Sequence, residues 1–579
     1  MERREVNMKK TRKILVFSAL FIFILSFTAY SAPVPSGEQV IRTQELERQD
    51  KDLRDKIETE KPKADIQKET PEQHAPVSTA EEKTLIKNIT VIGVTLLSDK
   101  EINQIITPYK DKELTLGDMQ TAANLITDAY RQKGYITSRA YLPPQKIQNS
   151  LLEIMVLEGM MGDVQVKGNR FFKTSLIKRK ISLKKNKPFN YNALRSDMAK
   201  LNEMPDRSTK AVLVPGKDAG TTDLVLEVKD RLPIHIGFDW DNFGSRYIDN
   251  QHYGVTLIDN NLTGFDDKLT YQYQMAQSSR YYLNNLRYVL PLDNTWDLGA
   301  YAMLSRVKLG REYEDQDVRG KSQVYGVFVN NYLLNTDTLD FNLSLGFDYK
   351  NSINHQNGAV TSHDKLRIAK FGLDLDVTDI FGRTILTNEL ACGIPNIMGG
   401  SEAKDAEVSN RAGGKFVKDT LNLLRLQKMP FSSAILWKNQ LQLSSYALPS
   451  TEQFQIGGVT NVRGYPPAEA VGDRGLSTTV EWSFPPYLFP KNIKVPLSKA
   501  NFYDAFRVVA FYDWANSRLK RPAVATDKRT QTLSSLGCGI RFNLPEDLAL
   551  RVEIAWPLDD KTASDGHHAR TWASFSKSF

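Results

Sequence analysis

The chain has 579 residues, of which 41% are hydrophobic and 25% charged, and its formal net charge is +8 at pH 7. This length is too great for one ordinary domain, and a mean hydropathy of −0.40 excludes a bundle of transmembrane helices. A pI near 9.0 would suit a nucleic-acid-binding protein. The first segment argues for export instead, and an exported protein seldom meets nucleic acid.

Residues 1–31 have the pattern of a secretory signal peptide. Basic residues precede a short apolar run at residues 14–27, and the small residues Ala29 and Ser31 follow it. An uncleaved membrane anchor is the alternative, although the run is short for a span. Met8 is a second candidate for the initiator, because Met8-Lys9-Lys10 is a usual beginning of a signal peptide.

Residues 32–83 are predicted to contain a polar helix and a linker. Between residues 37 and 58, only Leu46, Leu53 and Ile57 form an apolar stripe at helical spacing. A stripe this thin cannot anchor a helix in a large core, so the helix either is solvated or docks into a polar cavity. Residues 61–82 carry three prolines among polar residues, which is typical of a linker.

A repeat follows at residues 84–159 and 160–231. The pattern that starts at Ile89 and includes Gly93 returns at Val164 and Gly168, an offset of 75 residues. Each copy continues with two helical stretches and closes with two strands, in the order βααββ. Two copies are too few for a solenoid, so two tandem α+β domains are predicted.

The order of these elements and the stretch from Tyr130 to Tyr135 resemble polypeptide-transport-associated (POTRA) domains of two-partner secretion transporters. A three-stranded βααββ sheet leaves an edge that can accept a strand from another chain. The strand order of the family places the exposed edge of the second domain, and a substrate-binding site with it, at Lys210, Ala211, Val212, Leu213 and Val214. The alternative is that both domains are spacers.

From residue 232 to residue 579 the sequence alternates with a period of two. Between residues 339 and 349 every second side chain is apolar, and about sixteen such segments occur, most of them near ten residues long. Long strands with one apolar and one polar face predict an antiparallel outer-membrane β-barrel with a polar lumen, since a soluble barrel would turn its apolar side chains inward. The terminal Phe579 resembles the assembly signal of outer-membrane proteins.

The two cysteines, Cys392 and Cys538, are expected to face lipid on roughly the ninth and fourteenth strands. Side chains that far apart around a barrel cannot be bridged, so no disulfide is predicted.

The loop at residues 457–475 joins the eleventh and twelfth predicted strands and carries Val462, Arg463, Gly464 and Tyr465 in sequence. A long loop rich in glycine and proline can turn down into the barrel, where the planar guanidinium of its arginine would suit carboxylates. The alternation places two such carboxylates, Glu481 and Asp513, on the lumen face of the next two strands. Gly464 would permit close backbone approach, and Tyr465 would pack beside the arginine.

This constellation resembles the BamA-like superfamily, whose sixth extracellular loop has a Val-Arg-Gly-Tyr/Phe tip and whose barrel wall has a Phe-x-Asp-x-Gly motif. Here the wall motif begins at Phe511 and ends in Ala515 instead of glycine, which puts the local backbone in doubt but leaves the carboxylate in place. Two amino-terminal domains behind a helix and a linker are similar to the two-partner secretion transporters (TpsB family, FhaC/ShlB/HecB-like).

The resemblance implies an outer-membrane protein with periplasmic POTRA domains, in which residues 37–58 plug the pore. It implies export of a large exoprotein, such as an adhesin or haemolysin, with outer-membrane lipid and lipopolysaccharide as the other partners and a monomeric chain. Two alternatives stay open: an insertase that assembles other barrels, and a passive pore.

No catalytic residue, metal or cofactor is predicted. The chain has no complete phosphate-loop motif, Gly-x-x-x-x-Gly-Lys-Ser/Thr, and ATP would not be available beyond the inner membrane, so export is expected to proceed without ATP. The seven histidines are scattered, and the pair His567-His568 is more simply explained as solvated side chains in a turn than as a metal site.

Overall fold

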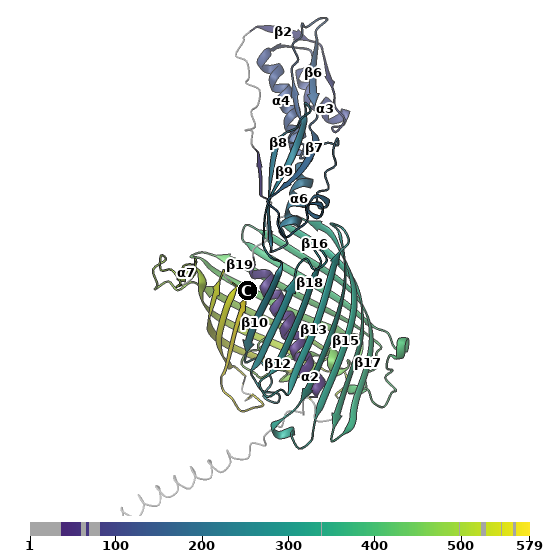
Figure 1. Cartoon of the computed structure of the whole chain (residues 1–579), viewed down its shortest axis with the longest axis vertical. Helices are drawn as coiled ribbons and strands as arrows, with labels where there is room; N and C mark the ends of the chain where they lie inside the picture. The colour runs from purple at the N-terminus through teal and green to yellow at the C-terminus, as the bar shows by residue number, and fades with distance from the viewer. Residues whose placement is uncertain are drawn as a thin grey trace, which may run out of the picture.

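The computed structural model describes residues 36–59, 65–68, 82–336, 338–496, 498–522, 528–545, 547–559 and 563–579. The predicted signal peptide and most of the predicted linker lie outside these residues. Figure 1 shows a β-barrel with one helix inside it and two small domains stacked beyond one end. Of the helices in the described ranges, none combines the length and the apolar character that a membrane span requires.

Within the described residues, sixteen strands close into a barrel in which every neighbouring pair is antiparallel, which confirms the predicted strand number. The strands are β10 (Ile234–Asp241), β11 (His252–Asp259), β12 (Lys268–Ala276), β13 (Tyr281–Pro291), β14 (Trp296–Lys308), β15 (Arg319–Asn335), β16 (Leu339–Gln356), β17 (Ala359–Asp379), β18 (Gly382–Gly393), β19 (Phe416–Met429), β20 (Ser433–Ser444), β23 (Arg474–Phe484), β24 (Phe506–Arg518), β25 (Thr530–Leu544), β26 (Leu548–Pro557) and β27 (Arg570–Ser578).

The two faces of the barrel wall differ as the alternating sequence predicts. On β16, Lys350 and Ser352 are buried in the lumen, whereas Leu345 is 63% exposed on the outside. The cysteines Cys392 and Cys538 are free, and they belong to β18 and β25, the ninth and fourteenth barrel strands. An apolar outer face around a polar interior is the arrangement of a transmembrane barrel.

The helix inside the barrel is α2 (Gly37–Glu58), drawn in purple in Figure 1. Ser36 caps its first turn in a capping box: its hydroxyl accepts a hydrogen bond from the amide of Gln39, and the side-chain oxygen of Gln39 accepts one from the amide of Ser36. At its start Gly37 packs against Gly320 of β15, and near its end the carbonyl of Lys56 accepts a hydrogen bond from Arg383 of β18 at 2.7 Å. The helix therefore docks into a polar cavity and spans the length of the lumen.

Each of the two small domains has its own apolar core. The first contains β3 (Asn88–Ile92), α3 (Asp99–Ile106), α4 (Leu116–Gln132), β5 (Arg139–Tyr141) and β6 (Leu151–Leu157), with sheet order β3-β6-β5, and a separate pair joins β2 (Lys83–Ile86) to β4 (Lys112–Thr115). The second contains β7 (Met160–Lys167), α5 (Thr174–Arg179), α6 (Tyr191–Asn202), β8 (Arg207–Pro215) and β9 (Thr221–Asp230).

The prediction of an open edge at residues 210–214 is wrong. Strand β1 (Asp65–Lys68), from the segment between α2 and the first domain, pairs in parallel with β8, so that Asp65 lies opposite Lys210 and Lys68 opposite Leu213. The sheet order of the second domain is therefore β1-β8-β9-β7. The prolines and polar composition of residues 61–82 indicate a linker, and the four residues of β1, which contain one apolar side chain, give no signal for a strand.

The second small domain is fastened to the nearest barrel turn by buried ion pairs. Arg207 donates two hydrogen bonds to Asp266, at 3.0 and 3.1 Å, and both side chains are almost fully buried. Asp206 accepts hydrogen bonds from Arg231 at 2.8 Å and from Asn260 at 2.7 Å. The contacts of Arg207 with Asp266 and of Asp206 with Asn260 join the second small domain to the end of the barrel.

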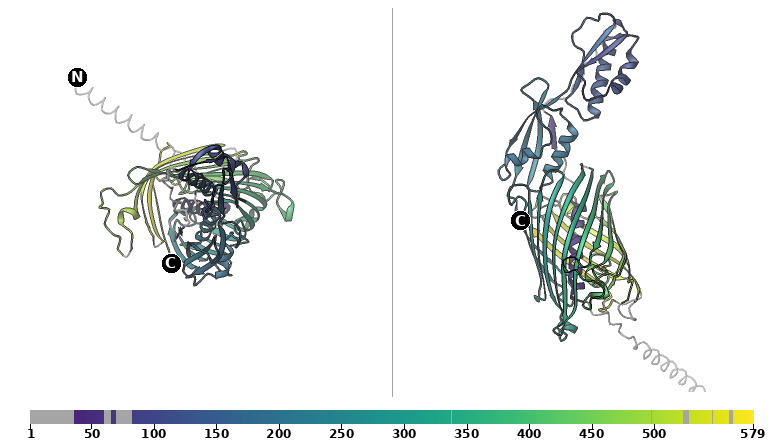
Figure 2. Two further views of the ribbon diagram at one scale, coloured as in Figure 1. Left: turned by 90° about the horizontal axis from the view of Figure 1, so that it is seen from above. Right: turned by 90° about the vertical axis from the view of Figure 1, so that its right-hand side faces the viewer.

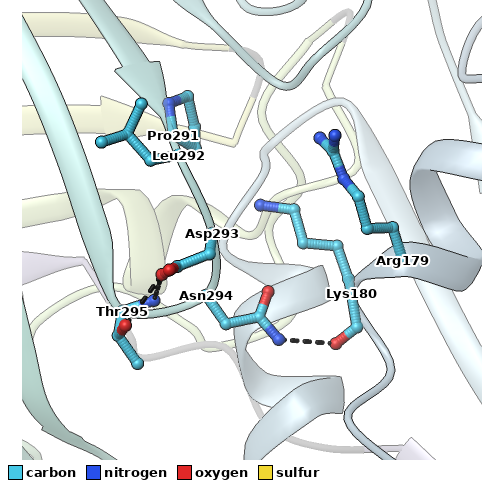
Figure 3. Close-up of a pocket in the computed structure, with 7 residues that line it drawn as sticks. All are labelled: Arg179, Lys180, Pro291, Leu292, Asp293, Asn294 and Thr295. Atoms are coloured by element: carbon cyan, nitrogen blue, oxygen red, sulfur yellow. Dashed lines mark hydrogen bonds between the residues drawn. The ribbon is translucent and has the colours of Figure 1, made fainter.

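A pocket of about 260 Å³ lies in the same seam, between α5 and the β13–β14 turn (Figure 3). Its lining includes Lys180, whose carbonyl accepts a hydrogen bond from Asn294 at 2.8 Å and whose ammonium lies 3.6 Å from Asp266. Burial lowers the pKa of Lys180. Since its polar groups already have partners across the seam, we interpret the pocket as part of the domain junction.

The arginine loop and the lumen helix as the candidate functional site

The loop between β20 and β23 folds back into the barrel. Its two arms form a small antiparallel ladder, β21 (Phe454–Ile456) with β22 (Ala470–Gly472). Gly457 and Gly458 begin the turn with φ values of 102° and 88°, which favour glycine. Val462 and Tyr465 are fully buried in an apolar cluster with side chains of the barrel wall. The loop therefore fills part of the lumen.

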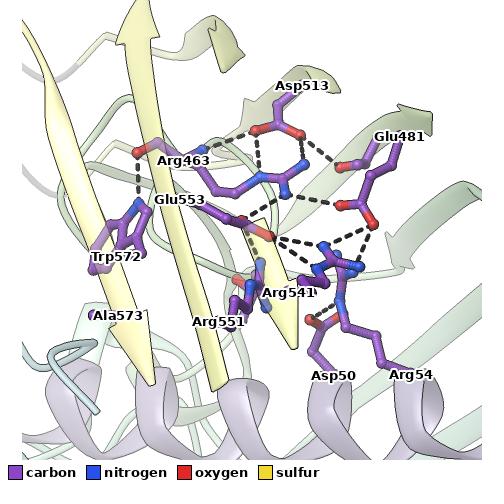
Figure 4. A network of polar contacts seen from close by, with 12 residues as sticks. Asp50, Arg54, Arg463, Glu481, Asp513, Arg541, Arg551, Glu553, Trp572 and Ala573 are labelled. Atoms are coloured by element: carbon purple, nitrogen blue, oxygen red, sulfur yellow. Dashed lines mark hydrogen bonds and ion pairs between the residues drawn. The ribbon is translucent and has the colours of Figure 1, made fainter. Parts of the chain in front are cut away.

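Arg463 lies at the centre of this buried loop and is 1% exposed. Its guanidinium donates to Asp513 at 2.8 and 3.0 Å and to Glu481 at 2.8 Å, and its backbone amide donates to Asp513 at 3.1 Å (Figure 4). The ring of Phe511 lies beneath the guanidinium, with 3.2 Å between the central carbon and the ring centroid. The structure thus brings together Arg463, Asp513, Glu481 and Phe511.

Two further contacts of Arg463 were not predicted. Glu553 accepts a hydrogen bond from the guanidinium at 2.9 Å, and the indole of Trp572 donates to the carbonyl of Arg463 at 2.8 Å. The alternating pattern places Glu553 on the lumen face of β26, which is the signal that could have identified it. Nothing in the sequence indicates which lumen carboxylates the loop reaches, because that depends on how far the loop descends.

The neighbours of Arg463 fit the loop closely against the wall. A side chain at Gly464 would begin 2.8 Å from the Cβ of Ser535 and 2.8 Å from the backbone nitrogen of Pro557, so only glycine fits there without a shift. The hydroxyl of Tyr465 donates to Asp559 at 3.3 Å.

The lumen helix contacts the same carboxylates. Arg54 of α2 lies 3.4 Å from one oxygen of Glu481, whose other oxygen binds Arg463. Arg541 of β25 lies 2.8 Å from both Glu481 and Glu553. Asp50, one helical turn before Arg54, accepts from Arg54 at 2.9 Å (Figure 4). The helix, the loop and the wall therefore share one charged network.

Lys438 of β20 joins the helix to the loop a second time. Its ammonium donates both to the carboxylate of Asp50 on α2 and to the carbonyl of Thr460 in the loop. All three groups lie in the lumen, so loss of any one of them leaves the others with one partner fewer.

The first half of the helix is held by a second network. Thr43 donates to the side chain of Gln455 at 2.8 Å, and Gln455 donates to the carbonyl of Gln39 at 2.8 Å. Lys350 lies 3.6 Å from Glu45 of the helix and 3.2 Å from Glu452 of the loop. Both halves of the helix are thus bound to the loop that carries Arg463.

The helix occupies the lumen with mostly polar side chains. Seven acidic and five basic residues stand among the 22 residues of α2. A helix that leaves a protein exposes its apolar surface to water, which is the main cost of release. That cost is small for a helix whose apolar residues are so few, so the polar contacts, which water can replace, determine how firmly it is held.

In the second small domain one carboxylate titrates near neutral pH. Asp197 of α6 accepts hydrogen bonds from the amide and the hydroxyl of Ser182, at 2.7 and 2.8 Å. Burial nevertheless raises the pKa of Asp197 to about 6. The carboxylate holds Ser182 in the segment that follows α5 and contributes a pH-dependent contact to this domain.

Comparisons with known proteins identify a family and relatives that this chain resembles. A family described as haemolysin secretion/activation protein ShlB/FhaC/HecB matches residues 220–503, and the ShlB-type POTRA domain matches residues 84–159. The heme/hemopexin transporter protein HuxB of Haemophilus influenzae (strain 86-028NP) is 25% identical over 496 residues, which cover 83% of this chain and 84% of HuxB. The outer membrane transporter CdiB of Dickeya dadantii (strain 3937) is 21% identical over 483 residues, which cover 81% of this chain and 84% of that protein.

The solved structure of CdiB from Escherichia coli shares the fold. It superimposes with a TM-score of 0.76 at 19% sequence identity and covers 95% of this chain and 100% of that chain. The segments matched by the two family models contain the first POTRA domain, much of the barrel and the loop of Arg463, and the matching proteins are transporters and not enzymes. The chain belongs to the ShlB/FhaC/HecB family of two-partner secretion transporters, with its barrel in the outer membrane and its POTRA domains in the periplasm.

Proposed function

We propose that this protein exports a large exoprotein of the adhesin or haemolysin type across the outer membrane without ATP. The observation that carries the proposal is the closed lumen: a sixteen-stranded pore holds a helix made mostly of charged residues, which is suited to release. The sequence lacks a complete phosphate-loop motif, because its Gly320-Lys321-Ser322 run has Asp315 where the motif requires glycine. This supports export that is driven by the folding or capture of the exoprotein outside.

We further infer that the exoprotein binds at β8, the strand that carries Lys210, Ala211, Val212, Leu213 and Val214. The edge of β8 accepts β1, which shows that its backbone can pair with an added strand. An arriving strand would compete with β1 for the same backbone groups. Only residues 59–64 separate the end of α2 from β1, so displacement of β1 would release the chain that holds the plug.

Proline substitutions in β1 test this proposal. Alternate amides of a strand point toward its neighbour, so either Ile66→Pro or Gln67→Pro removes a hydrogen bond to β8. We expect that variant to bind the amino-terminal region of the exoprotein more tightly, because a competitor is weakened. The exoprotein to use is a large secreted repeat protein, sought first among the products of the neighbouring genes, and binding is measured with the full-length transporter in nanodiscs.

Alanine at the same positions is the matched control, since Ile66→Ala and Gln67→Ala keep the backbone donors. Unchanged binding by both proline variants would overturn competition at β8. Secretion of that repeat protein by cells that lack the transporter would overturn the proposed function itself.

A further inference from the structure

The connection between β23 and β24 is unlike the other turns at the POTRA end of the barrel. It spans residues 485–505, of which 497 is not described, whereas two residues separate β17 from β18 and four separate β13 from β14. Turns on the periplasmic side of outer-membrane barrels are ordinarily short. Figures 1 and 2 show this segment, with the short helix α7 (Phe502–Ala505), projecting sideways from the barrel wall.

The segment is ordered by its own hydrogen bonds. The amide of Val495 donates to the carbonyl of Ala500 at 3.0 Å, and the amide of Phe502 donates to the carbonyl of Ile493 at 2.7 Å. Tyr487, near the start of the segment, joins it to the β19–β20 turn: its hydroxyl donates to the carbonyl of Phe431 at 3.0 Å. It is therefore a folded hairpin with a fixed direction.

Its large apolar side chains are exposed. Leu488 is 97% exposed, Tyr487 52%, Phe489 47% and Ile493 44%. About half or more of each side chain is therefore left uncovered by the described residues of the chain. Apolar residues gathered in this way on a surface mark a contact with a membrane or another protein.

Ring contacts connect the hairpin to the lipid-facing side of the barrel. The ring of Tyr487 stacks on Phe484 with centroids 6.1 Å apart, and Phe484 contacts Trp482 on the outer face of β23 at 5.3 Å. On the other arm, the ring of Phe502 lies 5.2 Å from Phe506 and 6.1 Å from Phe542. The apolar surface of the hairpin thus continues the surface that already contacts acyl chains.

The charges of the hairpin suit a phospholipid headgroup layer. Residues 485–505 contain Lys491, Lys494 and Lys499 and one acidic residue, Asp504. Aromatic and basic side chains together are typical of segments that lie at a membrane interface, where the rings enter the acyl boundary and the lysines meet anionic phosphates.

We propose that the described parts of this segment, residues 485–496 and 498–505, form an in-plane anchor that inserts into the periplasmic leaflet of the outer membrane and favours anionic phospholipids. The exposed rings and Leu488 lie among the upper acyl carbons, and Lys491 and Lys494 lie at the phosphates. Because the anchor joins the strands that carry Glu481 and Asp513, it fixes the depth in the bilayer of the wall that binds Arg463.

A spin label at position 488 tests the anchor in the full-length protein. In a Cys392→Ala, Cys538→Ala background, Leu488→Cys is labelled and the protein is placed in liposomes of phosphatidylethanolamine with or without phosphatidylglycerol. Insertion about 5–10 Å into the headgroup and acyl boundary makes the label more accessible to oxygen than to a water-soluble nickel complex. The matched control is Asp315→Cys. Asp315 lies in an exposed loop at the opposite end of the barrel, so a label there is expected to be fully accessible to the nickel complex.

Each result decides between occupants of the apolar surface. A Leu488 label as accessible to nickel as the Asp315 label overturns the anchor. A label shielded from both reagents also overturns it, because another protein, such as a second copy of this chain, then covers the hairpin. The ratio of oxygen accessibility to nickel accessibility is expected to be higher when phosphatidylglycerol is present. In the variant Lys491→Gln/Lys494→Gln, phosphatidylglycerol should no longer raise this ratio. If it still does, the preference for anionic lipid is overturned.

Discussion

Arg54 of the lumen helix and Arg463 of the folded-back loop bind opposite oxygens of one carboxylate, that of Glu481, at 3.4 and 2.8 Å. The plug and the loop are therefore not independent obstructions in the pore. Loss of either arginine leaves Glu481 with one partner fewer in a buried site. A substitution in the helix is therefore expected to alter the contact between Glu481 and the loop.

The first prediction concerns the pairing of Arg463 with Asp513. Removal of one partner leaves the other charge buried, which costs about 3–5 kcal/mol where burial is complete and less in a wet lumen. Arg463→Ala and Asp513→Ala are each expected to reduce secretion sharply while the barrel still reaches the membrane. Arg463→Lys should restore little, because an ammonium cannot present the planar pair of donors.

The double variant distinguishes a coupled pair from two independent residues. Arg463→Ala/Asp513→Ala should be little worse than either single variant, since the interaction is already lost in each. Secretion and heat-modifiable migration are measured for all three variants. Additive losses, or normal secretion by Arg463→Ala, would contradict the proposed anchoring role.

The second prediction concerns the plug. Deletion of residues 37–58 should raise the conductance of the protein in planar bilayers, because the lumen loses the helix that fills it. Arg54→Ala should increase the frequency of large openings without deletion, since it removes contacts to Asp50 and Glu481.

Lys51→Ala is the matched control for Arg54→Ala. Lys51 is an exposed cation on the same helix, whereas the contacts to Asp50 and Glu481 are made by Arg54. The substitution Lys51→Ala should leave the conductance unchanged. Equal effects of the two substitutions would mean that charge on the helix, and not the contact with Glu481, governs opening.

The third prediction concerns Gly464. Gly464→Ala should weaken the loop, because the new Cβ would lie 2.8 Å from both Ser535 and Pro557. Gly346→Ala, on the lumen face of β16, is the control, since its Cβ would meet its nearest neighbours at 3.4 to 3.7 Å, ordinary contact distances. Secretion and the temperature of heat modification should fall for Gly464→Ala alone, and equal behaviour would show that the loop can shift.

The fourth prediction is a pH dependence in the second POTRA domain. Burial raises the pKa of Asp197 from its ordinary value of 3.8 to about 6, so the folded domain binds this proton more tightly than the unfolded chain does. The stability that comes from the proton is present below pH 3.8 and is lost as pH rises through about 6. A shift of this size corresponds to roughly 2–3 kcal/mol between the two limits.

Asp197→Asn keeps an acceptor for Ser182 and removes the titration. Thermal unfolding of residues 82–231 between pH 4 and pH 7 should therefore lose its Asp197-dependent slope in this variant. A wild-type fragment whose stability does not fall across this range would contradict the raised pKa.

The barrel was predictable from the sequence because a β-strand alternates its faces residue by residue. That regular alternation fixed the strand number, the lumen position of Glu481 and Asp513, and the outward direction of Cys392 and Cys538. The repeat of glycines and apolar residues identified the two POTRA domains in the same local way. The thin apolar stripe of residues 37–58 indicated a helix for a polar cavity or for water.

Tertiary structure alone decided which distant groups meet. Pairing of β1 with β8 uses backbone groups that every residue carries, so four linker residues could cover the predicted open edge without a distinctive sequence. The contacts of Arg463 with Glu553 and Trp572 depend on how far the loop descends and on closure of the barrel, which brings β26 and β27 beside it. Sequence periodicity determines the face on which a side chain lies, whereas its partner depends on the position of the whole loop or helix in the closed barrel.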